Sequence, residues 1–123
     1  MMTAPPREVL ARIARVAHDV NRAYCQAIGD TSQPEWDDAP DWMHAASIDG
    51  VRAMLANPDS TPEDTHKRWV AHKIHNGWTY SEKKNPECKT HPCICAYWDL
   101  PLEQRVKDRL FTQVVTSMRE YAP

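Results

Sequence analysis

Tryptophan side chains are the groups in this chain best suited to hold a flat organic ligand. Two of them, Trp36 and Trp78, lie outside the expected helices and beside polar residues, where one indole face can stay open. Trp42 and Trp69 lie on helical apolar stripes and are expected in the core. Because each indole buries a large apolar area, filling a small core is the alternative role for Trp36 and Trp78 as well.

Lysine side chains crowd around Trp78 in the sequence. Lys73 precedes it, and Lys83, Lys84 and Lys89 follow it. A lysine ammonium can bind a phosphate as a point charge, whereas lysines in loops are usually solvated. We expect a ligand contact from Lys73 and a solvated loop at Lys83 and Lys84.

Four potential zinc ligands, Cys88, His91, Cys93 and Cys95, fall within residues 88–95. Zinc needs four tetrahedral ligands, which usually come from two separated pairs. These four are too close together for an ordinary pair of knuckles, and Pro92 restricts the chain between them. We therefore expect no metal, and a zinc-binding structural module is kept only as a second alternative function.

No catalytic motif is recognisable in the sequence. It has neither a GxSxG nor an HExxH pattern and no paired catalytic acids. Its three glycines are too few for a backbone cradle around phosphates. We predict a protein that is not an enzyme.

Length and composition predict one domain over residues 1–123, with 41% hydrophobic and 26% charged residues. The net charge of −2 and the lack of a basic stripe argue against a nucleic-acid polymer as partner. No apolar run approaches the ~20 residues that cross a membrane. The first residues contain no uninterrupted apolar stretch, so a cytoplasmic location with reduced cysteines is expected.

Apolar periodicity and Gly/Pro punctuation predict four principal helices, near residues 6–29, 40–57, 61–77 and 99–118. Thr3 is the expected cap of the first. The residues expected to face inward are Leu10, Ile13, Val16, Val20, Tyr24 and Ile28 in the first helix, Trp42, Ala45, Ile48, Val51 and Leu55 in the second, and Val106, Leu110, Val114 and Met118 in the fourth. Short strands at 78–80 and 93–97 are expected to pair as a β-hairpin. The predicted fold class is mostly α, with four principal helices and one short β-hairpin.

An internal duplication is suggested by the frame H-x(4)-A-x(5)-G, which occurs at 18–29 and at 66–77. Asp-x-Pro follows each copy, at 38–40 and 99–101. These repeats predict two helix–linker–helix halves, 6–58 and 61–120, related by a pseudo-twofold axis. Superposing the halves places Asn21 where the second half has Trp69. The amide could read the edge of a base, or it could belong to a buried hydrogen-bond network that ties the linker to the helix.

The residue order of the second half resembles the ryanodine-receptor repeat, the RyR domain. This family occurs in animal calcium-release channels and as small free-standing proteins in bacteria and phages, and the chain is similar to the free-standing type. The first half lacks the Gly-Trp and Lys-x-His-Pro elements of the motif. The matching residues are His66, Trp69, Lys73, Ile74, Gly77, Trp78, Tyr80, Lys89, His91, Pro92, Tyr97, Leu100 and Pro101.

The resemblance implies a role for Trp78, because the corresponding tryptophan of channel repeats stacks on an adenine base. A non-catalytic domain that binds a nucleotide or adenine-type ligand in a cleft between the halves is therefore expected, and it could sense or sequester a nucleotide signal. Lys89 and His91 could instead close the hairpin by hydrogen bonds. The alternative function is a protein-interaction or regulatory module, with a protein partner or a second copy of the chain. The expected ligand-binding residues are Asn21, Tyr24, Gln33, Trp36, Lys73, Trp78, Tyr80, Lys89 and His91.

Overall fold

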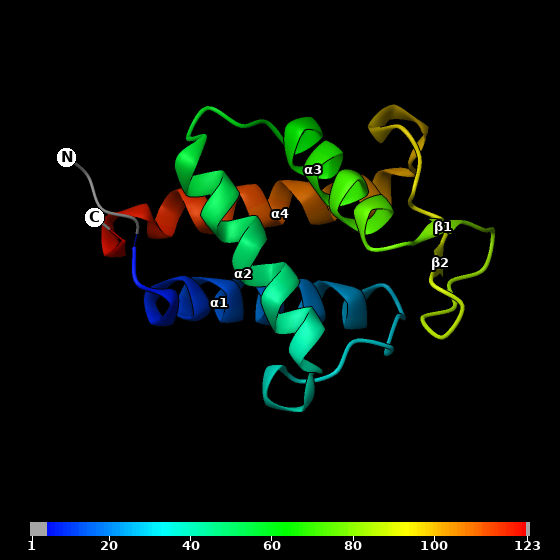
Figure 1. Cartoon of the computed structure of the whole chain (residues 1–123), viewed down its shortest axis with the longest axis horizontal. Helices are drawn as coiled ribbons and strands as arrows, with labels where there is room; N and C mark the ends of the chain where they lie inside the picture. The colour runs from blue at the N-terminus through cyan, green and yellow to red at the C-terminus, as the bar shows by residue number, and fades with distance from the viewer. Residues whose placement is uncertain (1–4, 123) are drawn as a thin grey trace.

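Four helices carry most of this computed structural model, which describes residues 5–122 (Figure 1). They are α1 (Arg7–Ala27), α2 (Asp41–Ala56), α3 (Pro62–His75) and α4 (Leu102–Met118). Three 3-10 turns, η1 (Trp36–Asp38), η2 (Tyr97–Asp99) and η3 (Arg119–Tyr121), complete the helical part. The predicted mostly α fold with four principal helices is confirmed.

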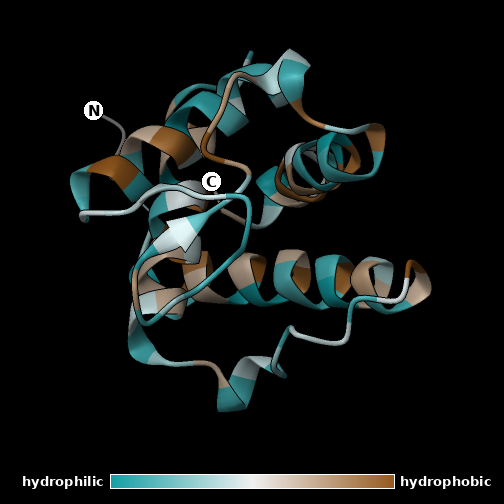
Figure 2. Ribbon diagram, turned by 90° about the vertical axis from the view of Figure 1, so that its right-hand side faces the viewer, coloured by the Kyte–Doolittle hydropathy of each residue, from teal (hydrophilic) through white to brown (hydrophobic). Residues whose placement is uncertain are grey.

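The helices pack in two layers around one apolar core. In Figure 1, α1 and α4 run side by side in opposite directions, and α2 crosses in front of them. The core joins Leu10 and Ile13 of α1 to Val51 and Met54 of α2 and to Val115 of α4, each at most 1% exposed. Burying a side chain of this size stabilises the fold by about 1.5–3 kcal/mol. Figure 2 shows the apolar residues in bands along the helices, with mostly polar connecting segments.

The inward face of α1 differs from the predicted stripe. Val16 and Ile28 are 38% and 41% exposed, whereas Ala14 and Ala17 are buried. Because alanine side chains are small, this part of α1 leaves open space beside α2 and α3. Trp42, which was expected in the core, is 48% exposed at the start of α2.

Helix α3 begins with a capping box, in which the Thr61 hydroxyl accepts from the Asp64 amide and the Asp64 carboxylate accepts from the Thr61 amide. Pro62 occupies its first turn, where no amide hydrogen is needed. Helix α1 has Pro6 at its N-cap position, and Thr3 lies outside the described residues. Pro6 makes no side-chain cap hydrogen bond, so the predicted capping signal is present in the structure at α3.

The same turn ends α1 and α3. Gly29 and Gly77 both adopt positive φ, 89° and 86°. The Gly77 amide donates to the Ile74 carbonyl, and the next amide, of Trp78, donates to the Lys73 carbonyl at 2.9 Å. The Asp30 amide makes the equivalent 2.8 Å bond after Gly29. This pair of hydrogen bonds defines a Schellman motif, which fixes the residue after each glycine against the last helical turn.

The small β element is present, but its strands are parallel and do not form the expected antiparallel hairpin. β1 (Thr79–Tyr80) pairs with β2 (Thr90–His91). The segment 93–97, expected as the second strand, instead leads through a turn into η2.

The parallel pairing follows from a second reversal of the chain between the two strands. Asn85 and Thr90 exchange two backbone hydrogen bonds of 3.0 Å, and Lys89 between them has a left-handed φ of 55°. Two successive reversals restore the original direction, so β2 runs alongside β1. Sequence periodicity carries no signal for such a turn.

Each half contains a helix histidine bound to a carbonyl two residues before a 3-10 turn. His18 Nε2 lies 2.7 Å from the Pro34 oxygen, and His66 Nε2 lies 2.8 Å from the Cys95 oxygen. These matching contacts support the hypothesis of two half-repeats, 6–58 and 61–120. The division of the single domain 1–123 and its pseudo-twofold axis stay predictions.

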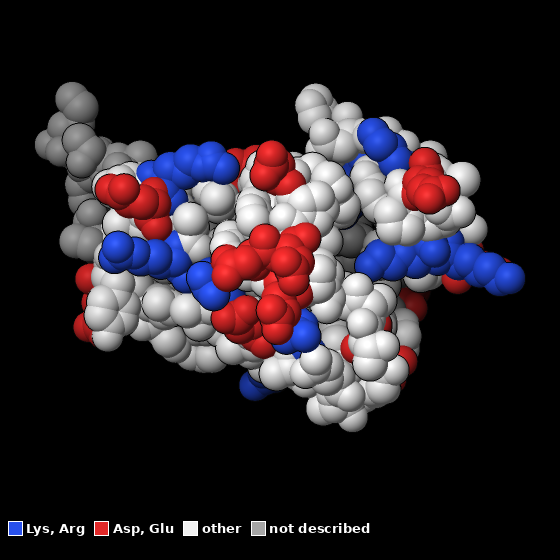
Figure 3. Space-filling view, turned by 90° about the horizontal axis from the view of Figure 1, so that it is seen from below, with Lys and Arg blue, Asp and Glu red and all other residues white. Residues whose placement is uncertain are grey.

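Surface charges are mixed where the first linker meets α1. Viewed from below, Figure 3 shows acidic and basic side chains next to each other. Arg15 lies 3.5 Å from Asp37, and Arg22 lies 3.9 Å from Glu35. Exposed ion pairs of this kind contribute about 0–1 kcal/mol each. No helix within residues 5–122 combines the length and the apolar character that crossing a bilayer requires.

Candidate ligand-binding site

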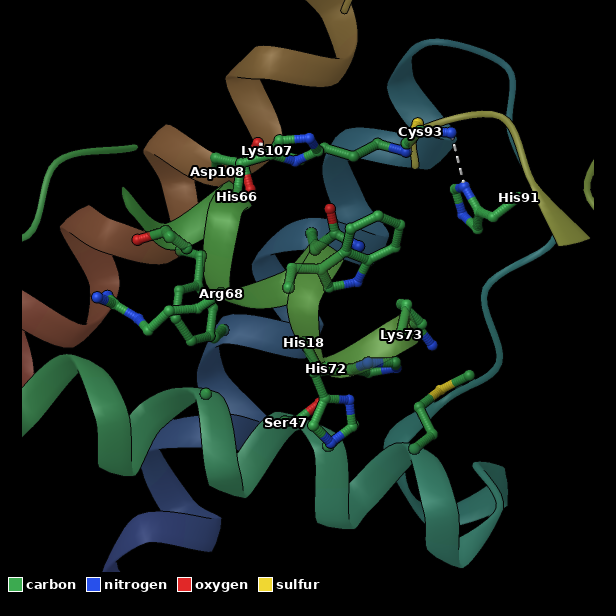
Figure 4. Close-up of a pocket in the computed structure, with 18 of the residues that line it drawn as sticks. His18, Ser47, His66, Arg68, His72, Lys73, His91, Cys93, Lys107 and Asp108 are labelled. Carbon is green, nitrogen blue, oxygen red and sulfur yellow. Dashed lines mark hydrogen bonds and ion pairs between the residues drawn. The ribbon is translucent and has the colours of Figure 1, made fainter. Parts of the chain in front are cut away.

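A cavity of about 700 Å³ lies where α1, α2, α3 and the first turns of α4 face one another (Figure 4). The chain segment from Trp78 to Cys93 contributes to its wall. The buried alanines of α1, Ala14 and Ala17, line it on one side. A volume of this order suits a drug-sized or nucleotide-sized molecule.

Three indoles surround one ammonium group on the aromatic side of the cavity. The Nζ atom of Lys73 lies 4.3 Å from the ring centroid of Trp78, 4.9 Å from that of Trp42 and 5.8 Å from that of Trp69. Lys73 is only 8% exposed and Trp78 only 7%. Each desolvated cation–π contact of this kind contributes up to about 2 kcal/mol. We call these four residues the tryptophan cage.

Local structure explains how the cage forms. The Gly77 turn returns the chain so that the Trp78 amide binds the Lys73 carbonyl, which brings the two side chains together. Trp69 lies one helical turn before Lys73 on α3, and i, i+4 residues share a helix face. Trp42 comes from the start of α2, with its ring centroid 6.2 Å from that of Trp78. Only this third contact depends on tertiary packing.

Two opposing effects act on the Lys73 ammonium. Burial lowers the pKa of Lys73, and the positive charge of Lys84 lowers it further. The faces of the indoles attract the cation and act in the opposite direction. The described residues supply no carboxylate within ion-pair distance of this ammonium. Lys73 is therefore a buried cation held by aromatic faces alone.

His91 lies at another side of the cavity, where the charges of several lysines act on it. Burial lowers the pKa of His91 to about 4, with further lowering by Lys84, Lys73 and Lys107. The ring is therefore neutral at pH 7. Its Nδ1 atom accepts a 3.0 Å hydrogen bond from the Cys93 amide, the contact dashed in Figure 4. An anion placed among these lysines would be stabilised by all of them.

A histidine–carboxyl pair lies on the α3–α4 side of the cavity. His66 is 3% exposed, and its Nδ1 atom is 3.6 Å from Oδ2 of Asp108. Burial raises the pKa of Asp108 to about 7, and Lys107 acts against this shift. Near neutral pH the carboxyl is therefore protonated in a large fraction of molecules and can donate a hydrogen bond.

Two polar groups of the first half also line the cavity. The Oδ1 atom of Asn21 is buried, and no donor among the described residues reaches it. A buried acceptor without a partner is costly, so this atom favours a ligand that brings a donor. Asp30 follows the Gly29 turn, and hydrogen bonds from the side chain and amide of Ser32 lower the pKa of its carboxyl.

The structure brings together five of the nine expected ligand-binding residues. Asn21, Gln33, Lys73, Trp78 and His91 all line the cavity. They come from α1, the first linker, α3 and the segment after α3, so the shared wall depends on tertiary packing.

The other four expected residues lie elsewhere. Tyr24 donates its hydroxyl to the Glu103 carbonyl at 2.7 Å, and Trp36 stacks on His44 with centroids 4.1 Å apart. Tyr80 is 58% exposed. The Lys89 ammonium donates to the Asn76 carbonyl at 2.9 Å, so it closes the end of α3 and does not enter the cavity.

Sequence reasoning missed the contribution of α4 to this site. Gln104, Lys107, Asp108 and Phe111 line the cavity at helical spacing i, i+3, i+4, i+7. Three of these four are polar, which is unusual for an inward stripe. The polar stripe is visible in the sequence, but it lies next to the apolar positions 106, 110 and 114, which give the stronger periodic signal.

The cysteines do not assemble with histidines or acids into a metal site within the described part of the chain, where no three such groups converge. Cys88 is exposed, and Cys93 directs its thiol toward Gln104 Oε1 at 3.6 Å. All four cysteines are free thiols. Burial raises the pKa of the Cys93 and Cys95 thiols, so neither is an activated nucleophile.

Comparison with protein-family models gives a match to the model described as RyR domain over residues 47–119. The match covers more than half of the chain and extends from within α2 through α4. It includes Trp69, Lys73 and Trp78 of the tryptophan cage, and both members of the His66–Asp108 pair. It begins after Asn21 and Trp42.

Proposed function

The chain belongs to the RyR domain family, and from this premise we propose that it binds a nucleotide-like small molecule in the cavity between its two halves. The RyR domain is not a known catalytic family. The ligand would be held without being transformed, as in a sensor or a sequestering protein for a nucleotide signal.

The observation that supports this proposal best is the pairing of an aromatic wall with a basic wall across one cavity. Trp42 and Trp78 offer indole faces, and base stacking on such a face contributes ~1–3 kcal/mol. Lys84 and Lys107 line the same cavity, where their positive charges add to burial in lowering the pKa of His91. A molecule with a flat base and a negative group matches both walls at once.

Asn21 supplies the feature that favours a nucleobase over other flat molecules. Its unpartnered Oδ1 atom accepts hydrogen bonds, and its amide nitrogen donates them. A base edge with an exocyclic amine next to a ring nitrogen offers the complementary pair. This agrees with an adenine-type ligand.

Thermal unfolding with AMP and ATP tests the proposal. A ligand at a hundredfold excess over its Kd stabilises the folded protein by about 2.7 kcal/mol, so the melting temperature should rise clearly. Asn21→Leu, which removes the unpartnered acceptor, should reduce the rise. Tyr80→Ala, an exposed aromatic outside the cavity, should leave it unchanged. No stabilisation of the wild-type protein by any nucleotide would contradict the proposal.

One observation favours the alternative function, a protein-interaction module. Trp98 in η2 and Leu102, the first residue of α4, are 68% and 69% exposed. If they form a contact with a second copy of the chain, analytical ultracentrifugation will show a dimer that Trp98→Ser dissociates. A monomer at all concentrations would remove the support for this self-association.

A further inference from the structure

Lys73 covers the surface on which a base would stack. Its ammonium lies 4.3 Å from the Trp78 centroid and 4.9 Å from that of Trp42. Because Trp78 is only 7% exposed, little of its indole is open beyond the part that Lys73 covers. A base can reach this indole face only when the ammonium leaves it.

The ammonium also lacks a counter-charge. A buried lysine is ordinarily paired with a carboxylate, yet within residues 5–122 no acidic group pairs with Lys73. Lys84 and Lys107 line the same cavity and add positive charge. Asp108 is kept partly neutral there by burial. The carboxylates of Asp30 and Asp49 also line the cavity, but the four cationic side chains of Arg68, Lys73, Lys84 and Lys107 outnumber them. The cavity therefore has an excess of positive charge that an anionic ligand can neutralise.

We propose that Lys73 exchanges partners on binding and thereby makes the site selective for phosphorylated ligands. In the free protein the ammonium rests on Trp42 and Trp78. When a nucleotide binds, the base takes the indole faces and the displaced ammonium pairs with the phosphate. This inference rests on the proposed function and names the ligand class, a nucleotide rather than a nucleoside.

The exchange explains how one residue can discriminate between the two classes. A neutral nucleoside displaces the ammonium from the indoles and gives it no new partner, so the lost cation–π contacts weaken binding. A nucleotide replaces those contacts with a charge-assisted hydrogen bond to a phosphate oxygen. Lys73 thus weakens the binding of a nucleoside and strengthens the binding of a nucleotide.

Calorimetric titration of adenosine and AMP into the wild-type protein and Lys73→Met tests this exchange. Methionine keeps an unbranched apolar side chain in the cage without the charge. The wild-type protein should bind AMP at least about tenfold more tightly than adenosine. Lys73→Met should weaken AMP binding, tighten adenosine binding and so remove the preference.

Lys84→Met is the matched control, because Lys84 lines the cavity and does not rest on an indole. It should weaken AMP binding without tightening adenosine binding. Equal changes for adenosine and AMP in Lys73→Met would overturn the exchange and leave the proposed function standing. Failure of the wild-type protein to bind either molecule would instead refute the proposed function.

A measurement on the wild-type protein covers the case in which Lys73→Met does not fold. Ring currents of the indoles should move the NMR signals of the Lys73 ε-methylene protons upfield in the free protein. Saturation with AMP should return them to ordinary lysine positions. Signals that stay upfield at saturation would show that the ammonium has not left the cage, and would overturn the exchange.

Discussion

His66 Nδ1 lies 3.6 Å from Asp108 Oδ2, while the opposite nitrogen of the same ring lies 2.8 Å from the Cys95 carbonyl oxygen. The carbonyl can only accept a hydrogen bond, so Nε2 carries a proton, and in the neutral ring Nδ1 is the acceptor that faces the carboxyl. A protonated Asp108 therefore complements the ring. Since burial raises the pKa of Asp108 to about 7, that protonated form is available at neutral pH.

Asp108 should make the stability of the protein depend on pH. Its folded-state pKa of about 7 lies above the ordinary 3.8, so the folded protein binds the proton more tightly than the unfolded chain. Stability from this group is present below pH 3.8 and is lost as pH rises through 7. The whole shift corresponds to about 4 kcal/mol as an upper bound.

Asp108→Asn should remove this slope, and chemical denaturation from pH 4 to pH 8 would measure it. The comparison must be the difference between variant and wild type. The lowered pKa of His91 gives the opposite slope, since stability from that group is lost as pH falls toward 4. Parallel stability curves for the two proteins would contradict the shifted pKa of Asp108.

Phosphate binding should raise the pKa of His91. In the free protein, burial and the neighbouring lysines hold this pKa at about 4. A bound phosphate adds negative charge that stabilises the imidazolium, so the titration midpoint should move upward, and AMP affinity should increase as pH falls through the new midpoint. NMR of the His91 ring protons with and without AMP would show the shift.

Lys84→Met is the control for this measurement, and it should raise the titration midpoint of His91 without ligand. An unchanged midpoint at saturation with AMP would exclude a phosphate near His91.

Trp78→Phe separates the two roles of this indole. Trp78 is nearly buried, so the smaller ring should lower stability by about 1–2 kcal/mol. It also shrinks the stacking face, so AMP affinity should fall about tenfold. Trp98→Phe, at a position 68% exposed, should change neither quantity. Lower stability with unchanged AMP affinity would assign Trp78 to the core alone.

Gly77→Ala and Gly29→Ala form a matched pair. Both glycines have positive φ, and added Cβ atoms meet nothing closer than the Lys89 side chain at 4.0 Å, so the cost is backbone strain of about 1 kcal/mol in each case. Only Gly77 positions Trp78. Denaturation should give similar losses of stability for both variants, and calorimetry should show a larger loss of AMP affinity for Gly77→Ala. Equal affinities in the two variants would mean that the turn at Gly77 does not position the ligand site.

Features set by neighbouring residues were predictable from sequence. The capping box at Thr61, the glycine that ends α3 and the four helices all have local causes. The contact between Lys73 and Trp78 follows almost directly from the Gly77 turn, because the turn joins their backbones. Sequence patterns therefore account for the proximity of Lys73 and Trp78, while their role in binding stays a prediction.

Features set by the packing of distant segments were not predictable in this way. Trp42 occupies an apolar position of α2, yet it closes the cage at the edge of the cavity because α2 crosses α1 there. In the sequence Asp108 resembles a solvated helix residue, but in the structure α3 packs over it. The parallel strand pair depends on a second reversal at Asn85, for which periodicity offers no sign.

The glycine turns that end α1 and α3 place chemically different side chains on the wall of the cavity. Both turns carry the next residue back against the helix, but α1 delivers the carboxylate of Asp30 where α3 delivers the indole of Trp78. A cavity between two identical halves would accept an elongated molecule equally well in either orientation. Here the residues that follow the two glycines differ in charge and in shape, one being a carboxylate and the other an indole. The two glycine turns, although alike in backbone, therefore line the cavity with chemically different groups and make it asymmetric.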